Sequence, residues 1–473
     1  MPVFLLLLIS FLAFTGKAKN EKKKTINKSF VVNSDSEVSF DHRRGELIVE
    51  YIDGDEARLE ATVIVKGEDE EDVQTILDAM DVEVNEFGGG IEINTNENIK
   101  SWSTNSGWFW TRHKLVLKNG IEITSKVEQV TINAILYMPK VNVLSLGAKY
   151  DDIRVVTCQA NKIVVDLHSG VLKANNGIDA DAHIKIKYGK LDLQYIGDLR
   201  LESYDSKGSV GNVNNLVIDD KYSDIELGNV NSLEATLHDS DISLGNVSEA
   251  AIINDKYSEI QMGNVASLSA RLHDSDLYLG NVTGDANIVD KYSEIKFGHM
   301  QNGDWDLHDS KIVIENAGHL KVRTKYTEFE MKDVNSLSLN SHDDDFEINK
   351  IDDLTISESR YTQYQIRELA KTMDIGYSHD DDYIVEKSSS ELSKLDFNGK
   401  YTNLKLPLPS NLNYNLKGTM KYGNLKYPKD GVKETRYVKD GSDFEIEGVA
   451  VDGSEMLSVK IEAYDCNINL ENY

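Results

Sequence analysis

Histidine followed by aspartate recurs in the middle of this sequence, and this is the side-chain pair with the greatest chemical potential in the chain. His238-Asp239, His273-Asp274 and His308-Asp309 stand 35 residues apart. An imidazole beside a carboxylate can serve as a general base. A catalytic site, however, is a single asymmetric group of residues, whereas these pairs repeat unchanged. The repetition favours a structural or binding surface, and we predict no catalytic residues.

Two runs of three aspartates suggest a different chemistry, because calcium prefers clustered oxygen ligands. Each run directly follows a histidine. The candidate calcium ligands are Asp343, Asp344, Asp345, Asp380, Asp381 and Asp382. The glycine-rich nonapeptide of calcium-binding β-rolls is missing, and acidic turns are usually only solvated. We therefore predict no cofactor, and calcium is the one metal for which the sequence offers candidate ligands.

Three tryptophans, Trp102, Trp108 and Trp110, lie close together in a segment rich in serine and asparagine. Exposed on a surface, their rings would be anchors for a glycan or protein partner. Buried, they would close one end of a repeat domain. The sequence leaves both interpretations open.

These residues surround a repeat with a short period. Gly-Asn-Val occurs at 211–213, 228–230, 245–247, 263–265 and 280–282, in steps of 17, 17, 18 and 17 residues. Seven residues before four of these glycines stands Lys-Tyr-Ser or His-Asp-Ser, in alternation. The ladder formed by this alternation contains Lys221, Tyr222, His238, Asp239, Lys256, Tyr257, His273, Asp274, Lys291, Tyr292, His308 and Asp309. The pattern extends from Lys149-Tyr150 to Lys400-Tyr401 over fifteen rungs, where a rung is one repeat of about 17 residues.

Apolar and polar residues alternate within each rung, as a strand with one buried face requires. Leu216 and Ile218 precede Lys221, and Ile225 and Leu227 follow it. Hairpins would not keep identical residues in register at every step, whereas coiling in one direction does. We predict an all-β fold, a parallel β-solenoid or β-helix with rungs of about 17 residues, each with two or three short strands.

The alternation of residue types has a physical reason in a parallel stack, where neighbouring strands lie about 4.8 Å apart. Like charges at one position of successive rungs would repel each other, and alternation keeps Asp239 two rungs from the next aspartate in its column. Asp220, Asp255 and Asp290 directly precede the lysines of the ladder. We expect these carboxylates to pair with those lysines.

Four segments follow from this organisation. Residues 1–18 form a signal peptide, because the uncharged run Phe4–Phe14 is too short to span a bilayer, and no later apolar run is long enough. Residues 19–148 form an N-terminal strand–helix–strand capping block, with one short helix over Glu68–Met80 that buries Val73, Ile76, Leu77 and Met80. Residues 149–400 form the solenoid, and residues 401–473 add C-terminal rungs and a cap.

The composition limits the partner and the compartment. The chain has 51 Lys and Arg against 80 Asp and Glu, a net charge of −29, which excludes nucleic acid as a natural partner. With the signal peptide removed, we expect no membrane span. The protein should be exported to the periplasm, the cell surface or the medium. Cys158 and Cys466 either pair there or remain two free thiols.

The apolar start, the strand–helix–strand block and the stacked Lys-Tyr-Ser and Gly-Asn-Val units together resemble the putative-adhesin domain family of exported bacterial proteins. The resemblance covers nearly the whole mature chain. It implies a β-solenoid and an adhesin-like, non-enzymatic binding or structural role in the cell envelope. The implied partner is a protein or glycan at the cell surface or in the periplasm. The resemblance supplies no catalytic or ligand residues.

The alternative function is that of a carbohydrate-active enzyme, a polysaccharide lyase or hydrolase, because parallel β-helices also carry such enzymes. A groove with unique, non-repeating acidic and basic side chains in the middle of the solenoid would favour the enzyme. An uninterrupted ladder would favour the binding protein.

Overall fold

The computed structural model describes residues 20–95, 99–107, 110–125, 127–410, 412–451 and 457–471. Within these ranges the chain forms many short β-strands and one α-helix, and the strands of successive rungs pair in parallel. The predicted parallel β-solenoid is therefore confirmed. The predicted signal peptide lies outside the described residues. The chain divides into two compact units, 1–180 (unit 1) and 181–473 (unit 2).

The elements of unit 1 are β1 (Asn20–Val31), β2 (Glu37–His42), β3 (Leu47–Tyr51), β4 (Glu56–Gly67), α1 (Glu70–Ala79), β5 (Val82–Phe87), β6 (Gly90–Thr95), β7 (Ile99–Gly107), β8 (Trp110–Leu117), β9 (Glu122–Ser125), β10 (Val127–Met138), β11 (Val141–Lys149), β12 (Ile153–Val155), β13 (Ala160–His168) and β14 (Val171–Ala174).

Unit 1 combines an antiparallel sheet with the first parallel rungs. Strand β4 pairs antiparallel with β1 and β10, and helix α1 packs against β1 and β4. The side chain of Asp69 caps the helix by accepting hydrogen bonds from the N–H groups of Glu71 and Asp72. Strands β2 and β3 already pair in parallel with β11 and β12. Parallel stacking thus begins inside the segment for which we predicted a cap.

The elements of unit 2 are β15 (Asp181–Lys187), β16 (Lys190–Ile196), β17 (Leu199–Tyr204), β18 (Lys207–Lys221), β19 (Asp224–Leu227), β20 (Val230–His238), β21 (Asp241–Leu244), β22 (Val247–Lys256), β23 (Glu259–Met262), β24 (Val265–His273), β25 (Asp276–Leu279), β26 (Val282–Lys291), β27 (Glu294–His308), β28 (Lys311–Lys325), β29 (Glu328–His342), β30 (Asp345–Arg360), β31 (Gln363–His379), β32 (Asp382–Ser388), β33 (Lys394–Lys400), β34 (Asn403–Lys405), β35 (Tyr414–Lys421), β36 (Asn424–Lys426), β37 (Val432–Asp440), β38 (Asp443–Ala450), β39 (Leu457–Tyr464) and β40 (Asn467–Asn469).

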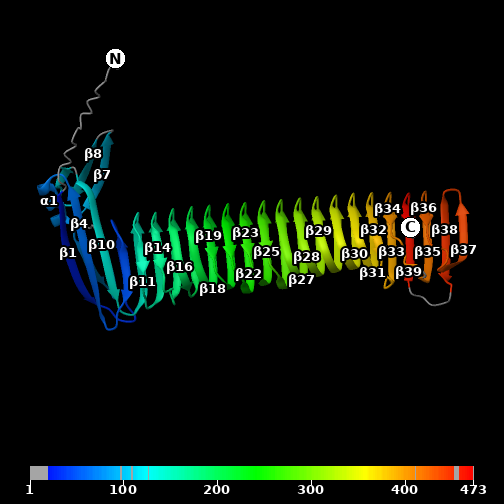
Figure 1. The fold of residues 1–473 in the computed structure, drawn as a ribbon, viewed down its shortest axis with the longest axis horizontal. Helices are drawn as coiled ribbons and strands as arrows, with labels where there is room; N and C mark the ends of the chain where they lie inside the picture. The colour runs from blue at the N-terminus through cyan, green and yellow to red at the C-terminus, as the bar shows by residue number, and fades with distance from the viewer. Residues whose placement is uncertain are drawn as a thin grey trace, which may run out of the picture. The chain divides into compact units, whose positions relative to one another are not determined.

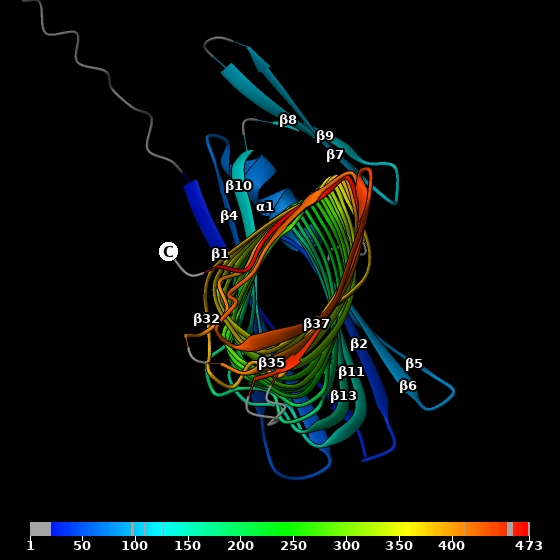
Figure 2. The same cartoon turned by 90° about the vertical axis from the view of Figure 1, so that its right-hand side faces the viewer.

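The rungs of unit 2 stack in the register that the sequence repeat predicts. Lys221 lies opposite His238, and His238 lies opposite Lys256. Figure 1 shows these rungs following one another from green to orange, and in Figure 2 they lie behind one another. A typical rung has two strands, such as β19 and β20, and the apolar residues of both strands face the interior. Stacking therefore builds one continuous apolar core.

A tight turn separates the two strands at the ladder residues. Each rung has two ladder residues: the first is a lysine or histidine in most rungs, and the second is the tyrosine or aspartate that follows it. Within unit 2 the second ladder residue of each rung has a positive φ between 47° and 70°. Its N–H donates to the carbonyl of the first ladder residue in the next rung, as from Tyr222 to His238 (3.1 Å). Aspartate tolerates this left-handed conformation, whereas tyrosine rarely adopts it. The turn of each rung is therefore held by the backbone of its neighbour.

The Gly-Asn-Val signature forms the opposite corner. The side-chain oxygen of Asn212 accepts a hydrogen bond from the N–H of Asn229 (2.9 Å), and Asn229 does the same for Asn246 (2.8 Å). A Cβ atom on Gly228 would lie 2.6 Å from the Asn212 oxygen, so only glycine fits beside this asparagine column. The signature thus marks a second set of contacts between rungs.

Buried polar side chains line the interior beside the tight turns. Asp220, Asp255 and Asp290 are at most 4% exposed. Asp290 accepts hydrogen bonds from Ser293 (2.5 Å) and Ser310 (2.6 Å). The expected pairing of these aspartates with the ladder lysines is wrong. Leu216, Ile218 and Asp220 stand at alternate positions of β18, and side chains at alternate positions of a strand point to the same side. Asp220 must therefore point into the interior.

The last strands do not lie at the end of the stack. Strand β39 lies between β33 and β35 and pairs in parallel with both, and β40 lies in the same way between β34 and β36. The antiparallel hairpin of β37 and β38 follows on the outer edge of β35. One rung of the stack is thus filled by a segment that comes later in the chain.

The buried aspartates predict a pH dependence. Burial raises the pKa of Asp290 above its ordinary value of 3.8. The folded state therefore holds this proton more tightly than the unfolded state, and the resulting stabilisation, complete below about pH 3.8, is lost as the pH rises through the raised pKa. We expect the melting temperature of Asp290→Asn, relative to wild type, to increase from about pH 4 to about pH 7.

Thermal melts followed by circular dichroism would measure this difference. The matched control is Asp309→Asn, which changes an aspartate in a neighbouring turn that is exposed. It shows what the same substitution does to the melting temperature at the protein surface over the same pH range. Parallel curves for Asp290→Asn and wild type would contradict the prediction.

Candidate functional site

A column of aromatic and imidazole rings runs along the turns of unit 2. The ring of His238, a first ladder residue, lies between the rings of Tyr222 and Tyr257, which are second ladder residues, at centroid distances of 5.6 and 5.5 Å. The side chains of two neighbouring ladder positions therefore meet in a single column. This alternation of ring types is the physical reason for the alternation of sequence signatures.

The column is continuous, with neighbouring centroids 5.4 to 6.0 Å apart and most pairs edge to face. In spatial order it contains Tyr188, Tyr204, Tyr222, His238, Tyr257, His273, Tyr292, His308, Tyr326, His342, Tyr361, His379, Tyr401, Tyr464 and Tyr422. Each such pair contributes about 0.5–1.5 kcal/mol beyond its buried area. We call the turns from Lys187-Tyr188 to Lys421-Tyr422, with the inserted Tyr464-Asp465, the ladder edge.

The tyrosines of the ladder edge are exposed as well as stacked. Tyr222, Tyr257 and Tyr292 are 44%, 48% and 47% exposed. The lysines lie against the rings, and the Nζ atom of Lys325 is 4.6 Å from the ring centroid of Tyr326. The ladder edge thus presents aromatic faces, cations and carboxylates to solvent in a regular order, which is a chemistry suited to binding.

Most of the His-Asp pairs lack the geometry of a catalytic pair. The Nδ1 atoms of His273, His308 and His342 are buried and make no hydrogen bond with any described residue. At His379 the Nδ1 atom lies 3.0 Å from the Asp380 carboxylate. A general base needs a partner that orients its ring, and the imidazoles of His273, His308 and His342 have no such partner at Nδ1 among the described residues. We therefore assign these rings to the stacked column.

Next to the ladder, five acidic side chains stand in register in successive rungs. The column consists of Asp224, Asp241, Glu259, Asp276 and Glu294. The expectation that a parallel stack avoids such rows is therefore wrong. At exposed positions two like charges about 4 Å apart cost only about 1 kcal/mol, and the buried residues behind them outweigh this. Ring packing, not charge separation, accounts for the ladder's alternation.

The candidate calcium ligands point in different directions. Asp344 and Asp381 are each 2% exposed and accept hydrogen bonds inside the solenoid from Ser341 (2.6 Å) and Ser378 (2.5 Å). Burial raises the pKa of both carboxyls. Asp343 and Asp380 occupy the tight turns, while Asp345 and Asp382 begin the next strands. Across the described ranges, no three His, Cys, Asp or Glu side chains are grouped to hold a metal.

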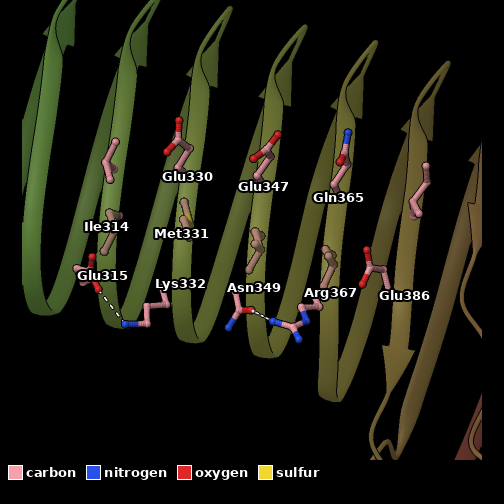
Figure 3. Close-up of a pocket in the computed structure, with 14 residues that line it drawn as sticks. Ile314, Glu315, Glu330, Met331, Lys332, Glu347, Asn349, Gln365, Arg367 and Glu386 are labelled. Carbon is pink, nitrogen blue, oxygen red and sulfur yellow. Dashed lines mark hydrogen bonds and ion pairs between the residues drawn. The ribbon is translucent and has the colours of Figure 1, made fainter.

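A shallow groove of about 470 Å³ lies on the outer face between β28 and β32. Figure 3 shows one row with Glu330, Glu347 and Gln365, and a second row with Glu315, Lys332, Asn349, Arg367 and Glu386. Glu315 pairs with Lys332 (3.1 Å), and Arg367 donates to Asn349 (3.1 Å). Glu330 and Glu347 are direct neighbours in register. These side chains do not repeat, so the groove meets the criterion set for the enzyme.

The candidate tryptophans remain a prediction. Trp108 lies outside the described residues, and Trp102 and Trp110 belong to β7 and β8, whose side chains at these positions are also outside them. The fourth tryptophan, Trp305, was not singled out by sequence reasoning. It is buried in unit 2, donates to the carbonyl of Ala286 (3.0 Å) and stacks on Phe297.

The cysteines are both free thiols, which settles the two alternatives left open by the sequence. Burial raises the pKa of Cys158 to about 11. Cys466 is buried in unit 2, two residues after Tyr464, and donates to the carbonyl of Tyr464 (3.4 Å).

Tyr464, Asp465 and Cys466 form a ladder turn that sequence reasoning missed. Tyr464 supplies a ring between Tyr401 and Tyr422, Asp465 has a φ of 54°, and Cys466 takes the buried position of the usual serine. The signal was present at Tyr204-Asp205-Ser206, where tyrosine already replaces histidine. A search by residue class, ring then aspartate then small residue, would have found it.

The chain is similar to known proteins only at low sequence identity. No family model matches the sequence, and no curated protein matches it. Among solved structures, a putative cell adhesion protein from Clostridium sporogenes is 11% identical over 47% of this chain and 100% of its own, with a TM-score of 0.22. A putative adhesin from Bacteroides fragilis is 11% identical over 63% of this chain and 97% of its own, with a TM-score of 0.19. A putative lipid binding protein from Parabacteroides distasonis is 12% identical over 71% of this chain and 97% of its own, with a TM-score of 0.17.

These names agree in part with the family that the sequence resembles, but at such identities and TM-scores the function of this chain does not follow from them. Helix α1 spans ten residues, and within the described ranges no helix is long and apolar enough to cross a membrane.

The ring column predicts how position 238 responds to substitution. His238→Lys removes two ring contacts and places three lysines in successive rungs, so we expect it to lower the free energy of unfolding by about 1–3 kcal/mol. His238→Tyr is the matched control, because Tyr204 already fills the same position between Tyr188 and Tyr222. Denaturant unfolding at low salt would measure both variants, and equal stability of the two would refute the ring column as a stabilising contact.

Proposed function

We propose that this protein is an exported, adhesin-like, non-enzymatic binding or structural protein of the bacterial cell envelope. It acts through the ladder edge, on a protein or glycan partner at the cell surface or in the periplasm. The observation that carries this proposal is the unbroken column of exposed tyrosines, stacked with histidines over successive rungs. Aromatic side chains in large exposed patches are common anchors for partners.

Repetition strengthens such a surface. Equivalent turns recur every two rungs, about 9.6 Å apart, so an extended or multivalent partner can engage several at once. Each additional contact then forms at a high effective concentration, and weak contacts add up to firm attachment. The proposed activity needs no cofactor, and the two aspartate triplets remain the calcium candidates of the sequence.

The test is binding to envelope fragments isolated from the bacterium that produces the protein. In the variant Tyr257→Asn, Tyr292→Asn, Tyr326→Asn, three exposed rings are lost, while asparagine still accepts the positive φ of the turn. We expect co-sedimentation with the fragments to weaken at least about tenfold, because the anchors of one interface act together.

The control variant, Ile252→Ser with Val289→Ser, removes two exposed apolar side chains outside the ladder edge, which are 47% and 52% exposed. It should bind like wild type. If the tyrosine variant bound as well as the control, the ladder edge would not be the binding surface.

The groove in Figure 3 supports a second candidate, a carbohydrate-active enzyme, through the neighbouring carboxylates of Glu330 and Glu347. Hydrolysis with retention uses two carboxyl groups about 5–5.5 Å apart. Glu330 lies 3.5 Å from Lys311, whereas Glu347 makes no ion pair with a described residue. One carboxylate beside a cation and one without an ion pair form an asymmetric arrangement, as a catalytic site requires.

The enzyme is tested by incubating the protein with polysaccharides of the producing bacterium and measuring reducing ends and unsaturated products. Under our proposal we expect no product. Product formation by wild type that is abolished in both Glu330→Gln and Glu347→Gln would establish the enzyme instead. Glu328→Gln, a change two residues before Glu330 on the same strand, is the control that should leave any such activity intact.

A further inference from the structure

Charged side chains alternate in sign from rung to rung along the ladder edge. The cations are first ladder residues of the Lys-Tyr turns, and the carboxylates are second ladder residues of the turns between them. In spatial order the central series is Lys221, Asp239, Lys256, Asp274, Lys291, Asp309, Lys325 and Asp343. Each charge thus has a charge of opposite sign on the neighbouring rung.

The alternation continues where the order of the chain is broken. Lys400 and Lys421 belong to β33 and β35, and the strand between them is β39, which ends at Tyr464. The turn after β39 supplies Asp465. A strand from elsewhere in the sequence thus continues the charge pattern, which does not depend on the tandem order of the repeat.

These charges are not paired with other charged side chains of the unit. None of the eight side chains of the central series forms an ion pair or a side-chain hydrogen bond with a described residue, although Lys325 rests on the ring of Tyr326. Other surface charges of the same rungs are paired, as in Lys296–Glu294 (2.8 Å) and Lys321–Asp304 (3.2 Å). The ladder edge therefore keeps its alternating charges available for a partner.

The partner best matched to an alternating series is the same series. If a second ladder edge faces the first with an offset of one rung, about 4.8 Å, every lysine meets an aspartate and every aspartate meets a lysine. The exposed tyrosine rings between the charges then become buried, and aromatic side chains are enriched in the cores of such interfaces. The chain's net charge of −29 and the acidic column next to the ladder repel a second copy, whereas the central series itself is neutral.

We propose that the ladder edge binds the ladder edge of a second copy of this chain, with the rungs of the two copies offset by one. This inference rests on the proposed function, and it names the partner as the protein itself. Because charge complementarity sets partner choice and orientation, the contact should select a like surface over a uniformly acidic or basic one.

The experiment uses the mature protein and two charge-reversed variants. The first carries Lys221→Glu, Lys256→Glu, Lys291→Glu and Lys325→Glu, and the second carries Asp239→Lys, Asp274→Lys, Asp309→Lys and Asp343→Lys. Sedimentation velocity at low salt measures association of each protein alone and of the two variants mixed. Circular dichroism melts identify a variant that fails to fold. Paired versions with two substitutions each, at 256 and 291 or at 274 and 309, then replace it.

We expect wild type to associate with itself at low salt and to dissociate as salt is added, because exposed charges are screened. Each variant alone should associate at least about tenfold more weakly, while the equimolar mixture recovers association, since opposite charges again face each other. A monomeric wild type at low salt would overturn the inference, as would a mixture that fails to recover.

The envelope-binding assay separates the two proposals. If wild type is monomeric yet binds envelope fragments through its tyrosines, the ladder edge recognises another protein or a glycan, and only the second-copy inference fails. If copies associate through the ladder edge but do not bind the fragments, self-association stands and the envelope partner is wrong.

Discussion

Parallel stacking at the spacing of β-strands is the constraint on which the rest of this structure depends. Because Lys221 lies opposite His238 and His238 opposite Lys256, equivalent positions of successive parallel rungs of unit 2 meet, apart from local register shifts. A position can therefore hold either a side chain that tolerates its own kind or a regular alternation of two side chains. Asparagine beside glycine is the first solution. In the second, lysine alternates with histidine at the first ladder position and tyrosine with aspartate at the second, so that the histidine and tyrosine rings of successive rungs meet. The interior serines and aspartates, which bond from rung to rung, follow the same rule.

Much of this fold could be predicted, because a fixed period is visible in the sequence. The period, the parallel register, the two corners and the helix with its buried residues Val73, Ile76 and Leu77 all follow from spacing and alternation. The inward direction of Asp220 also follows from the alternation of side chains along a strand. We expected instead that its carboxylate would pair with a lysine. The acidic column from Asp224 to Glu294 was not expected, because we assumed that like charges in register repel strongly. Water weakens this repulsion at exposed positions.

The ladder edge could be predicted only in part. The sequence places Lys-Tyr and His-Asp at equivalent positions, but it does not show that first-position histidines and second-position tyrosines lean into one column. That geometry arises from the left-handed turn, which a single sequence marks weakly when tyrosine occupies it. The groove around Glu330 and Glu347 was invisible for another reason, since its residues lie on separate rungs and share no motif.

The strand inserted between β33 and β35 has a consequence for the order of folding. A solenoid can grow by adding each rung to the one made before it, as the chain leaves a ribosome or a translocation pore. Here β35 and β36 are made before β39 and β40, so the edges of β33 and β35 that these later strands cover must wait unpaired. Unpaired strand edges recruit foreign strands. The C-terminal rungs should thus be the last to close, and they are the place where a chaperone or a protease would recognise an unfinished molecule.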